Sequence, residues 1–246
     1  MRATAIEFRL RMVINMAIIL LGLWSPWITF GNTGRRILLL EWLPLQINRL
    51  GLLPFSSAAT FVIALAAIIA ALGAFLRIAG AAYLGPGTVI NSEMLAGSVM
   101  ADGPYRYVRN PLYVGLWFMV AAIAFLMPPT GALCTMLLLS FFVLRLTLGE
   151  EAFLTAQIGQ PYRAYLQAVP RFLPRLRSPL PRQNSTPHWL KAVLAELAPI
   201  GIFVALAFFS WNYDSTLMGE VILIFFGLSL VVRAFLPKEK NLKAAE

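Results

Sequence analysis

Residues 111–148 read PLYVGLWFMVAAIAFLMPPTGALCTMLLLSFFVLRLTL, two apolar runs separated by Pro128-Pro129-Thr130-Gly131. A helix needs roughly 20 apolar residues to cross a bilayer, and the runs 111–127 and 132–148 come close to this length. Backbone polar groups in lipid have to be paired internally, which a helix achieves by itself. The short break allows only a tight turn, so the sequence predicts an antiparallel helical hairpin in a membrane.

Four further apolar segments extend this architecture. Of the 246 residues, 59% are apolar and only 13% are charged, and the mean hydropathy is +0.76. A soluble domain carries about 25% charged residues. We therefore expect an all-α, polytopic membrane protein with about six transmembrane helices, the other four at residues 12–30, 58–80, 192–211 and 217–236.

The formal net charge of +9 follows this topology rather than a nucleic-acid surface. With the amino terminus inside, 17 of the 20 Lys and Arg residues lie on or at the edge of the cytoplasmic side, and only Arg35, Arg36 and Arg49 lie outside. This is the positive-inside bias, and it also attracts anionic lipid head groups. We predict a multi-pass protein of the cytoplasmic membrane, with membrane lipids as partners, no nucleic acid, and functional loops that face the cytoplasm.

Residue usage also narrows the chemistry. The single cysteine, Cys134, and the single histidine, His188, are too few for a thiolate or imidazole metal site, so we expect no metal. The sequence lacks a Gly-rich phosphate loop and a GxSxG elbow. Hydrolytic and nucleoside-triphosphate chemistry therefore lose most of their support.

We interpret residues 1–246 as a single membrane domain in three parts. Residues 1–80 supply two spans, residues 81–174 carry two cytoplasmic loops around the hairpin, and residues 175–246 supply the last two spans. Residues 35–54 are predicted to lie on the external surface or to form a short re-entrant helix. The unusual polar residues gather in the central part.

That central part contains a polar motif directly where the hairpin begins, Gly103-Pro104-Tyr105-Arg106-Tyr107-Val108-Arg109-Asn110-Pro111-Leu112-Tyr113-Val114-Gly115. The second cytoplasmic loop, which we expect to start at Gly149, opens with Glu150-Glu151. Because the cytoplasmic ends of two hairpin helices are neighbours, the two polar clusters should converge at one membrane surface.

Asn110 followed by Pro111 predicts a helix start, with Asn as the cap and Pro in the first helical position. The amides of Leu112 and Tyr113 then lie unpaired at the positive end of the helix dipole, which favours a carboxylate or phosphate. Arg109 beside them offers a bidentate fork. The sequence therefore predicts an anion-binding helix end.

Aromatic faces and carboxylates complete the set of binding groups. Tyr105, Tyr107 and Tyr113 can stack on a heterocycle or hold a cation. Glu150 and Glu151 can accept hydrogen bonds from hydroxyls or an ammonium. A ligand that fits all of these groups has a carboxylate, an amine, sugar hydroxyls, a flat base and a positive centre, as S-adenosylmethionine does.

Each element taken alone also has a structural explanation. Tyr and Arg at an interface usually anchor a helix, Asn-Pro is an ordinary helix start, and a Glu-Glu pair is usually solvated. A carboxylate pair at the bilayer boundary is costlier to place than most charges, so Glu150 is the hardest of these residues to explain structurally.

The motif at 103–115 resembles the signature of the isoprenylcysteine carboxyl methyltransferase family and its phospholipid methyltransferase relatives. Glu150-Glu151, the run Gly159…Tyr162…Tyr165 and Val169-Pro170-Arg171-Phe172-Leu173-Pro174 are similar to the family in order and spacing. The resemblance covers about residues 81–174. It implies an integral membrane enzyme that takes its methyl group from S-adenosylmethionine on the cytoplasmic side.

The resemblance also implies which residues serve the cofactor and the substrate. An arginine about one helical turn before the glutamate faces the lipidic substrate in the family, and Arg145 is the nearest candidate. The cofactor contacts are expected from Gly97, Ser98, Val99, Met100, Tyr105, Arg109, Asn110, Pro111, Leu112, Tyr113 and, of the two glutamates, Glu150.

Asn110 departs from the family, because many members have His at this position. Asn keeps the helix cap but cannot accept a proton. A carboxylate acceptor needs no deprotonation at neutral pH, whereas an amine has to lose a proton first. The departure therefore favours an acceptor that is already ionised, with Glu151 as the alternative proton acceptor.

We therefore predict a methyltransferase that acts on a lipidic or lipid-linked acceptor entering from the bilayer, by resemblance through isoprenylcysteine-type carboxyl O-methylation. Phospholipid N-methylation is the alternative reaction, and a non-catalytic membrane protein that retains the fold is the alternative class. A transporter should have charged or helix-breaking residues near mid-membrane. The predicted spans have only Arg77, Arg145 and Arg233, near their ends.

Overall fold

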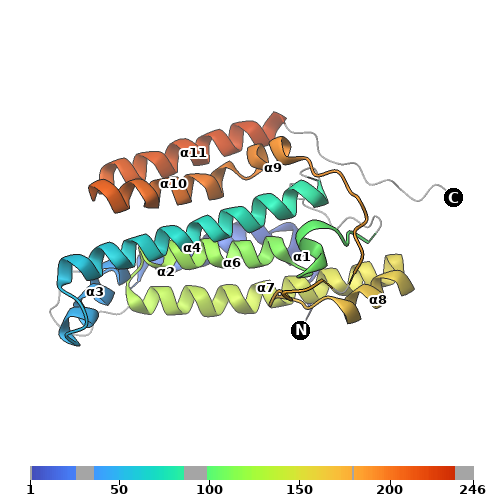
Figure 1. Ribbon diagram of the computed structural model, residues 1–246, viewed down its shortest axis with the longest axis horizontal. Helices are drawn as coiled ribbons and strands as arrows, with labels where there is room; N and C mark the ends of the chain where they lie inside the picture. The colour runs from blue at the N-terminus through green and yellow to red at the C-terminus, as the bar shows by residue number, and fades with distance from the viewer. Residues whose placement is uncertain (1, 26–35, 86–98, 179, 236–246) are drawn as a thin grey trace.

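The computed structural model describes residues 2–25, 36–85, 99–178 and 180–235. In these residues every regular element is helical, which confirms the all-α prediction (Figure 1). The elements are α1 (Ala5–Arg9), α2 (Arg11–Trp24), α3 (Leu39–Arg49), α4 (Phe55–Leu84), the 3₁₀ turn η1 (Gly103–Arg106), α6 (Pro111–Ala124), α7 (Pro129–Ile158), α8 (Gln160–Ala168), α9 (Trp189–Ala195), α10 (Leu197–Asn212) and α11 (Ser215–Phe235).

The predicted hairpin is present as α6 and α7, which lie side by side and are joined by residues 125–128. Pro129 occupies the first turn of α7, a position that needs no amide donor. The turn therefore lies just before Pro129, and Thr130 and Gly131 belong to the helix rather than to the break.

Helix α7 is much longer than the apolar run that predicted it. It continues for 30 residues to Ile158, whereas the apolar segment ends at residue 148. The added residues include Glu, Ala, Leu and Gln, which are good helix formers, so the helix continues where the hydrophobicity stops. The expectation of a loop from Gly149 is wrong, and Glu150 and Glu151 are part of α7.

The described helices support a membrane protein but do not confirm six spans. Three of them, α4, α7 and α11, are long and apolar enough to cross a bilayer. The pair α9 and α10 adds a fourth if it is one span, but the two helices are bent by 71°. The apolar helices α2 and α6 have 14 residues each, fewer than a full span needs. Residues 26–30 of the first predicted span lie outside the described residues.

Helix α3 falls within the segment predicted to be external or re-entrant. Its first amides are anchored on the hairpin turn, because Leu39 N donates to Met127 O at 2.8 Å and Leu40 N donates to Phe125 O at 3.0 Å. These bonds satisfy donors that a helix start leaves unpaired. The helix thus closes the end of the molecule opposite to the polar motif (Figure 1).

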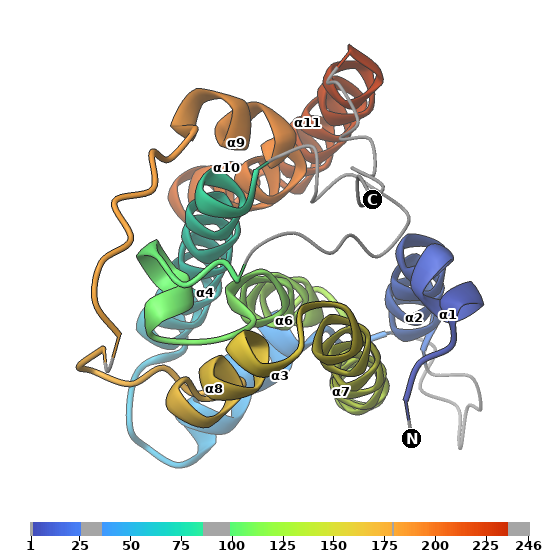
Figure 2. The same cartoon turned by 90° about the vertical axis from the view of Figure 1, so that its right-hand side faces the viewer.

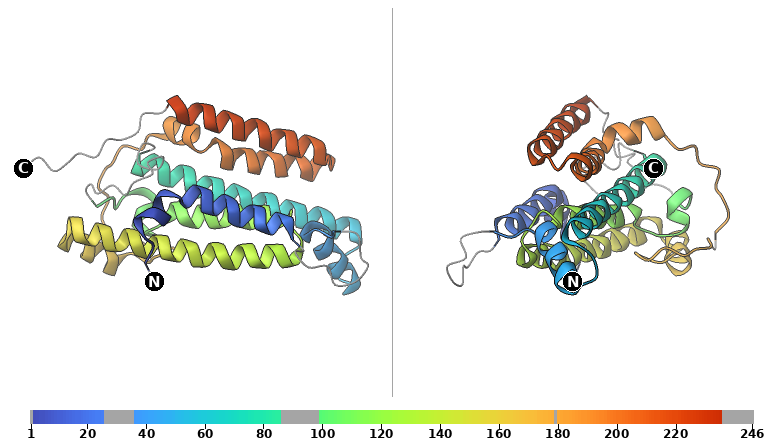
Figure 3. Two further views of the ribbon diagram at one scale, coloured as in Figure 1. Left: turned by 180° about the vertical axis from the view of Figure 1, so that it is seen from behind. Right: turned by 60° about the vertical axis from the view of Figure 1, so that its left-hand side comes forward.

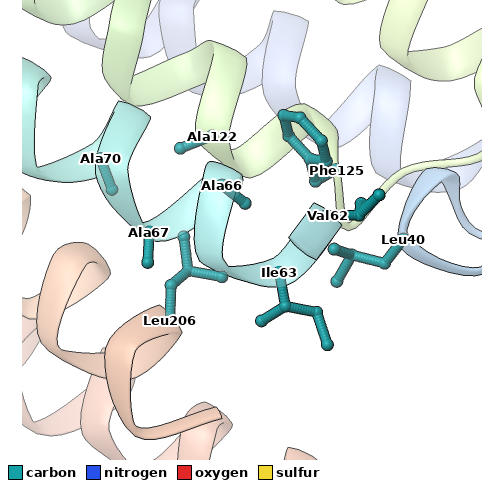
Figure 4. Close-up of a cluster of buried hydrophobic side chains, with 9 residues drawn as sticks. All are labelled: Leu40, Val62, Ile63, Ala66, Ala67, Ala70, Ala122, Phe125 and Leu206. Carbon is teal, nitrogen blue, oxygen red and sulfur yellow. The ribbon is translucent and has the colours of Figure 1, made fainter. Parts of the chain in front are cut away.

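A buried cluster joins α3, α4, α6 and α10 (Figure 4). On α4 the cluster uses small side chains, Ala66, Ala67 and Ala70, which let the neighbouring helices approach closely. Leu206 of α10 packs on the same face of α4. Helix α4 is therefore the central element, with α6 on one side and α10 on the other (Figure 3).

Helix α2 packs against α7 through glycines. A side chain at Gly22 would collide with Thr135, and one at Gly131 would collide with the Gly22 carbonyl, so both positions require glycine. The Ser25 and Thr130 hydroxyls share a hydrogen bond of 2.6 Å beside this contact. Helix α2 thereby packs directly on α7, the helix that carries Glu150 and Glu151.

Candidate active site

The polar motif and the carboxylates of α7 meet at one end of the helix bundle, where η1, α6, α7 and α8 come together (Figure 2). Asn110 occupies the N-cap position of α6 and Pro111 the first helical position, as predicted. Leu112 and Tyr113 follow in the first turn, where amides have no partner within the helix. The predicted anion-binding helix end is therefore present in its backbone.

The side chain of Asn110 does not cap this helix, contrary to the prediction. No cap hydrogen bond forms from it, and its Nδ2 instead donates to Arg171 O at 3.2 Å. The carbonyl of residue 171 is within reach because the chain there runs beside the entrance of α6. The Asn110 side chain therefore binds a neighbouring segment. It does not occupy the first-turn amides of α6, which stay available to a ligand.

That neighbouring segment is the Val169–Pro174 run, which entered the sequence analysis only as part of the resemblance. Arg109 N donates to Pro170 O at 2.9 Å, and Arg175 N donates to Tyr107 O at 3.0 Å. Together with the Asn110 contact, these bonds tie residues 107–110 of the motif to residues 170–175. The start of α6 is thus fixed by a segment about 60 residues later in the chain.

Glu151 forms a charged cluster with two arginines. Arg109 Nη1 lies 2.7 Å from its Oε1, and Arg171 contacts both oxygens, Nε at 3.0 Å and Nη2 at 2.7 Å. Glu151 is only 8% exposed, and its hydrogen bond raises the pKa of Arg171 above its ordinary value. Two cations face one carboxylate, so the cluster carries a net positive charge beside the start of α6.

Glu150 has different partners, because adjacent residues on a helix point about 100° apart. Its carboxylate contacts the Tyr113 hydroxyl through a hydrogen bond and interacts electrostatically with Arg11 of α2. The half-buried Glu150 therefore faces the interior between α2, α6 and α7. The two adjacent glutamates thus contact different residues on different sides of α7.

Tyr105 lies in η1, whose start is capped by Asp102 through a 3.0 Å bond from Gly103 N. The ring is 7% exposed, and burial raises the pKa of its hydroxyl well above the ordinary value. The Tyr165 hydroxyl donates to the Tyr105 carbonyl at 2.9 Å and fixes the turn on α8. The resemblance named Tyr165 only as part of a spacing, and the structure gives it this supporting contact.

Two buried polar atoms in this region have no hydrogen-bond partner within the described residues, the Tyr105 hydroxyl and Arg109 Nε. Buried polar groups are nearly always paired, so these donors mark a place that a polar ligand can complete. Both belong to residues that the motif assigns to the cofactor. The two unpaired donors therefore fit a polar cofactor that can accept hydrogen bonds from them.

The remaining predicted cofactor residues are placed only in part. Val99 packs against the buried cluster of Ala101, Tyr162 and Tyr165, and Met100 lies next to it in the chain. Gly97 and Ser98 lie outside the described residues. The described part of this segment is therefore held against α8, beside η1.

Arg145, predicted to face the lipidic substrate, is paired with the amino-terminal helix. Its Nη2 lies 2.9 Å from both carboxylate oxygens of Glu7 and 3.3 Å from Arg2 O. Its own carbonyl accepts from Ala3 N at 3.0 Å. The Thr4 amide and Arg145 hold the pKa of Glu7 below its ordinary value. Sequence reasoning missed Glu7, because it lies 138 positions from its partner.

An open cavity of about 400 Å³ lies beside the charged cluster, and Arg2, Glu151, Thr155 and Arg163 contribute to its lining. Among the described residues there is no group of three or more His, Cys, Asp or Glu side chains that could hold a metal ion. The chemistry of the site is therefore that of carboxylates, guanidinium groups and phenols.

Comparison with known families confirms the resemblance. Residues 61–160 match the phospholipid methyltransferase family. The matched region contains the motif at 103–115, all of α6 and α7, and both glutamates. No curated protein and no solved structure matches the chain. Helices α1 to α3 and α9 to α11 lie outside the matched region.

Proposed function

We propose that the chain is a membrane methyltransferase that transfers the methyl group of S-adenosylmethionine to a lipidic or lipid-linked acceptor, because residues 61–160 match the phospholipid methyltransferase family. The observation that carries the proposal is the meeting of the two parts of the motif. Arg109 and Tyr113 from one part contact Glu151 and Glu150 from the other. The rest of the proposal follows from the chemistry of these groups.

The cofactor would be held by groups on three elements. The first-turn amides of α6, at Leu112 and Tyr113, favour its carboxylate. Glu150 would accept from its amine or hydroxyls, and the unpartnered hydroxyl of Tyr105 is available for a further polar contact. When bound, S-adenosylmethionine supplies an electrophilic methyl group on a sulfonium.

The protein's contribution is alignment and exclusion of water rather than acid–base help. An in-line displacement depends mostly on positioning of the reacting groups. Both carboxylate oxygens of Glu151 already accept hydrogen bonds from Arg109 and Arg171, so they are engaged within the protein. The Asn110 amide donates to Arg171 O. Neither group is suited to deprotonate an amine.

This arrangement favours an acceptor that is already ionised, in line with isoprenylcysteine-type carboxyl O-methylation. Phospholipid N-methylation is the second candidate, because the matched family is that of phospholipid methyltransferases. The two candidates differ in the bond that forms, a methyl ester in one and an N-methyl group in the other. Their products can therefore be separated chemically.

The decisive experiment incubates the purified protein with methyl-labelled S-adenosylmethionine and two acceptors, a prenylated cysteine analogue and phosphatidylethanolamine vesicles. Label that is released as volatile methanol by mild base identifies a methyl ester. Base-stable label in the phospholipid fraction identifies N-methylation. Binding of S-adenosylhomocysteine without any transfer would identify a protein that retains the fold but not the activity.

Titration with S-adenosylhomocysteine tests the cofactor site separately. We expect Tyr113→Ala and Glu150→Ala to weaken binding strongly, and Glu220→Ala, on the exposed surface of α11, to leave binding unchanged. Absence of binding at millimolar ligand, or equal binding by all of these proteins, would overturn the proposal.

The cellular placement is part of the same proposal. The positive-inside distribution supports a multi-pass protein of the cytoplasmic membrane, with the site facing the cytoplasm. Labelling with a membrane-impermeant thiol reagent tests this orientation, with Cys134→Ser as background. In the Arg163→Cys variant, the new thiol on α8 should be protected from outside and react after permeabilisation.

A further inference from the structure

A buried ion pair joins the matched region to the carboxyl-terminal helices. Arg77 of α4 contacts Glu196 through two bonds, Nε to Oε2 at 2.6 Å and Nη2 to Oε1 at 2.8 Å. The Glu196 side chain is fully buried, and that of Arg77 is 15% exposed. Glu196 lies at the 71° break between α9 and α10, outside the matched region.

Arg77 also contacts the first turn of α6. Its Nη1 lies 3.5 Å from Leu112 O, and its side chain passes so close to Gly115 that a Cβ there would lie 2.6 Å from Arg77 Cγ. One turn along α4, a Cβ at Gly80 would lie 3.0 Å from the Leu112 side chain. The guanidinium therefore sits at the junction of α4, the start of α6 and the α9–α10 break.

The Arg77 guanidinium brings a positive charge to this junction. It lies beside the positive end of α6, where a second positive charge is unfavourable. Both Arg77 and Glu196 act electrostatically on the buried Tyr105 hydroxyl, which belongs to the proposed cofactor site. Glu196 is therefore the carboxylate that offsets the positive charge of Arg77 at this corner of the site.

We infer that Glu196 is a positioning residue that holds the Arg77 guanidinium against the first turn of α6 and neutralises it, so that the adjoining site accepts a positively charged methyl donor. This inference rests on the proposed function and deepens it. It gives the carboxyl-terminal helices a role in the site, although they contribute no residue of the motif.

The inference makes a prediction about ligand charge. S-adenosylmethionine carries a sulfonium, and S-adenosylhomocysteine carries a neutral thioether at the same place. An uncompensated Arg77 should repel the first ligand more than the second. Two unit charges on the order of 10 Å apart at an effective dielectric constant of about 20 interact strongly enough to change an affinity ratio by about tenfold. A general loss of structure would instead weaken the binding of both ligands to the same extent.

The test measures both dissociation constants by calorimetry on purified full-length protein in lipid nanodiscs. Glu196→Gln should weaken S-adenosylmethionine about tenfold relative to S-adenosylhomocysteine. Glu220→Gln, an exposed position on α11, is the matched control and should keep the wild-type ratio. The neutral double variant Arg77→Met/Glu196→Leu should also restore that ratio, because it removes both charges.

Arg233→Gln provides a second, milder variant. Arg233 Nη2 donates to Ala195 O at 3.3 Å, and this arginine interacts electrostatically with both Glu196 and Arg77. Its removal takes a positive charge away, so the ratio should shift by a smaller amount in favour of S-adenosylmethionine. This variant tests the inference even if Glu196→Gln does not fold.

The outcomes separate the inference from the proposed function. If the wild-type protein binds neither ligand, the proposed function fails. If it binds both and Glu196→Gln keeps the wild-type ratio, the inference fails while the proposed function stands. If Glu196→Gln does not fold, an unchanged ratio in Arg233→Gln overturns the inference in its place.

Discussion

Helices α7 and α11 are almost equally apolar, but they have very different surroundings. The most apolar windows of the two have mean hydropathies of 2.0 and 2.1. Yet 44% of the α7 window is buried inside the protein, against 6% of the α11 window. Helix α11 leaves large side chains such as Leu223 and Ile224 exposed and packs mainly on α10 (Figure 3).

The difference shows that the hydropathy of a helix indicates whether it suits a membrane, but not whether its side chains take part in a polar site. Helix α7 meets α1 through Arg145, near the end of its apolar part. Beyond that part, Glu151 meets the motif and the segment after α8. The described part of α11 contributes one contact of this kind, the bond from Arg233 to Ala195 O. Substitutions on α7 should therefore have large effects, and matched substitutions on α11 small ones.

The largest contrast is expected for the carboxylates. Glu151→Ala leaves Arg109 and Arg171 without their common partner, which should destabilise the protein by about 4 kcal/mol. Glu220→Ala on α11 should change the stability by less than about 0.5 kcal/mol. Thermal unfolding of both variants in the same detergent measures the difference. Equal shifts would break the contrast between the two helices.

A similar contrast is expected for leucine. Leu139 on α7 is fully buried, so Leu139→Ala should leave a cavity and destabilise the protein by about 3 kcal/mol. Leu223 on α11 is 71% exposed, and Leu223→Ala should stay within about 0.5 kcal/mol of the wild type. Denaturant titration of the two variants tests the packing difference. A large effect at Leu223 would show that α11 is covered in solution.

A smaller effect is expected for tyrosine hydroxyls. Tyr113→Phe removes the hydrogen bond to Glu150 and should weaken S-adenosylhomocysteine binding about fivefold, the equivalent of about 1 kcal/mol. Tyr213→Phe, just before α11, removes a 2.7 Å bond to Thr60 and should leave the affinity unchanged. Calorimetric titration compares the two. A loss at Tyr213 would mean that both ends of the molecule bear on the site.

The smallest effect is expected for the ion pair between Arg145 of α7 and Glu7 of α1, because α11 has no contact of this kind among its described residues. The pKa of Glu7 is lowered by the Thr4 amide and by Arg145, so its contribution is complete above about pH 4.5 and is lost as the pH falls through the folded-state value. Hydrogen exchange of α1 amides, corrected for intrinsic rates, should accelerate over that range. In Glu7→Gln this pH dependence should disappear, and α11 should show none in either protein.

The sequence predicts the elements well because helices in lipid depend on local hydrophobicity and turn residues. The hairpin follows from two apolar runs and Pro128-Pro129, and its presence is confirmed. The end of α7 was predicted wrongly, because helix propensity continues after the apolar pattern stops. The Asn110 cap was also wrong, because the amide found a carbonyl of a distant segment.

The partners within the site depend on the path of the chain. Gly159, with a φ of +75°, turns the chain from α7 into α8 and returns Arg171 to Glu151, 20 positions away. The pairs Arg77–Glu196 and Arg145–Glu7 span 119 and 138 positions. Opposite charges alone do not select these pairs among the 20 basic and 11 acidic residues, so only the folded arrangement identifies them.

The length of α7 has a consequence for the membrane itself. Glu150 lies 21 positions after Pro129, which is about 32 Å along the helix and close to the thickness of the hydrocarbon layer, about 30 Å. If Pro129 sits at one edge of that layer, the carboxylates stand at the other edge, level with the lipid head groups. The rate of methyl transfer should then depend on acyl-chain length, because a thicker or thinner bilayer moves the acceptor away from the height at which Glu150 is held.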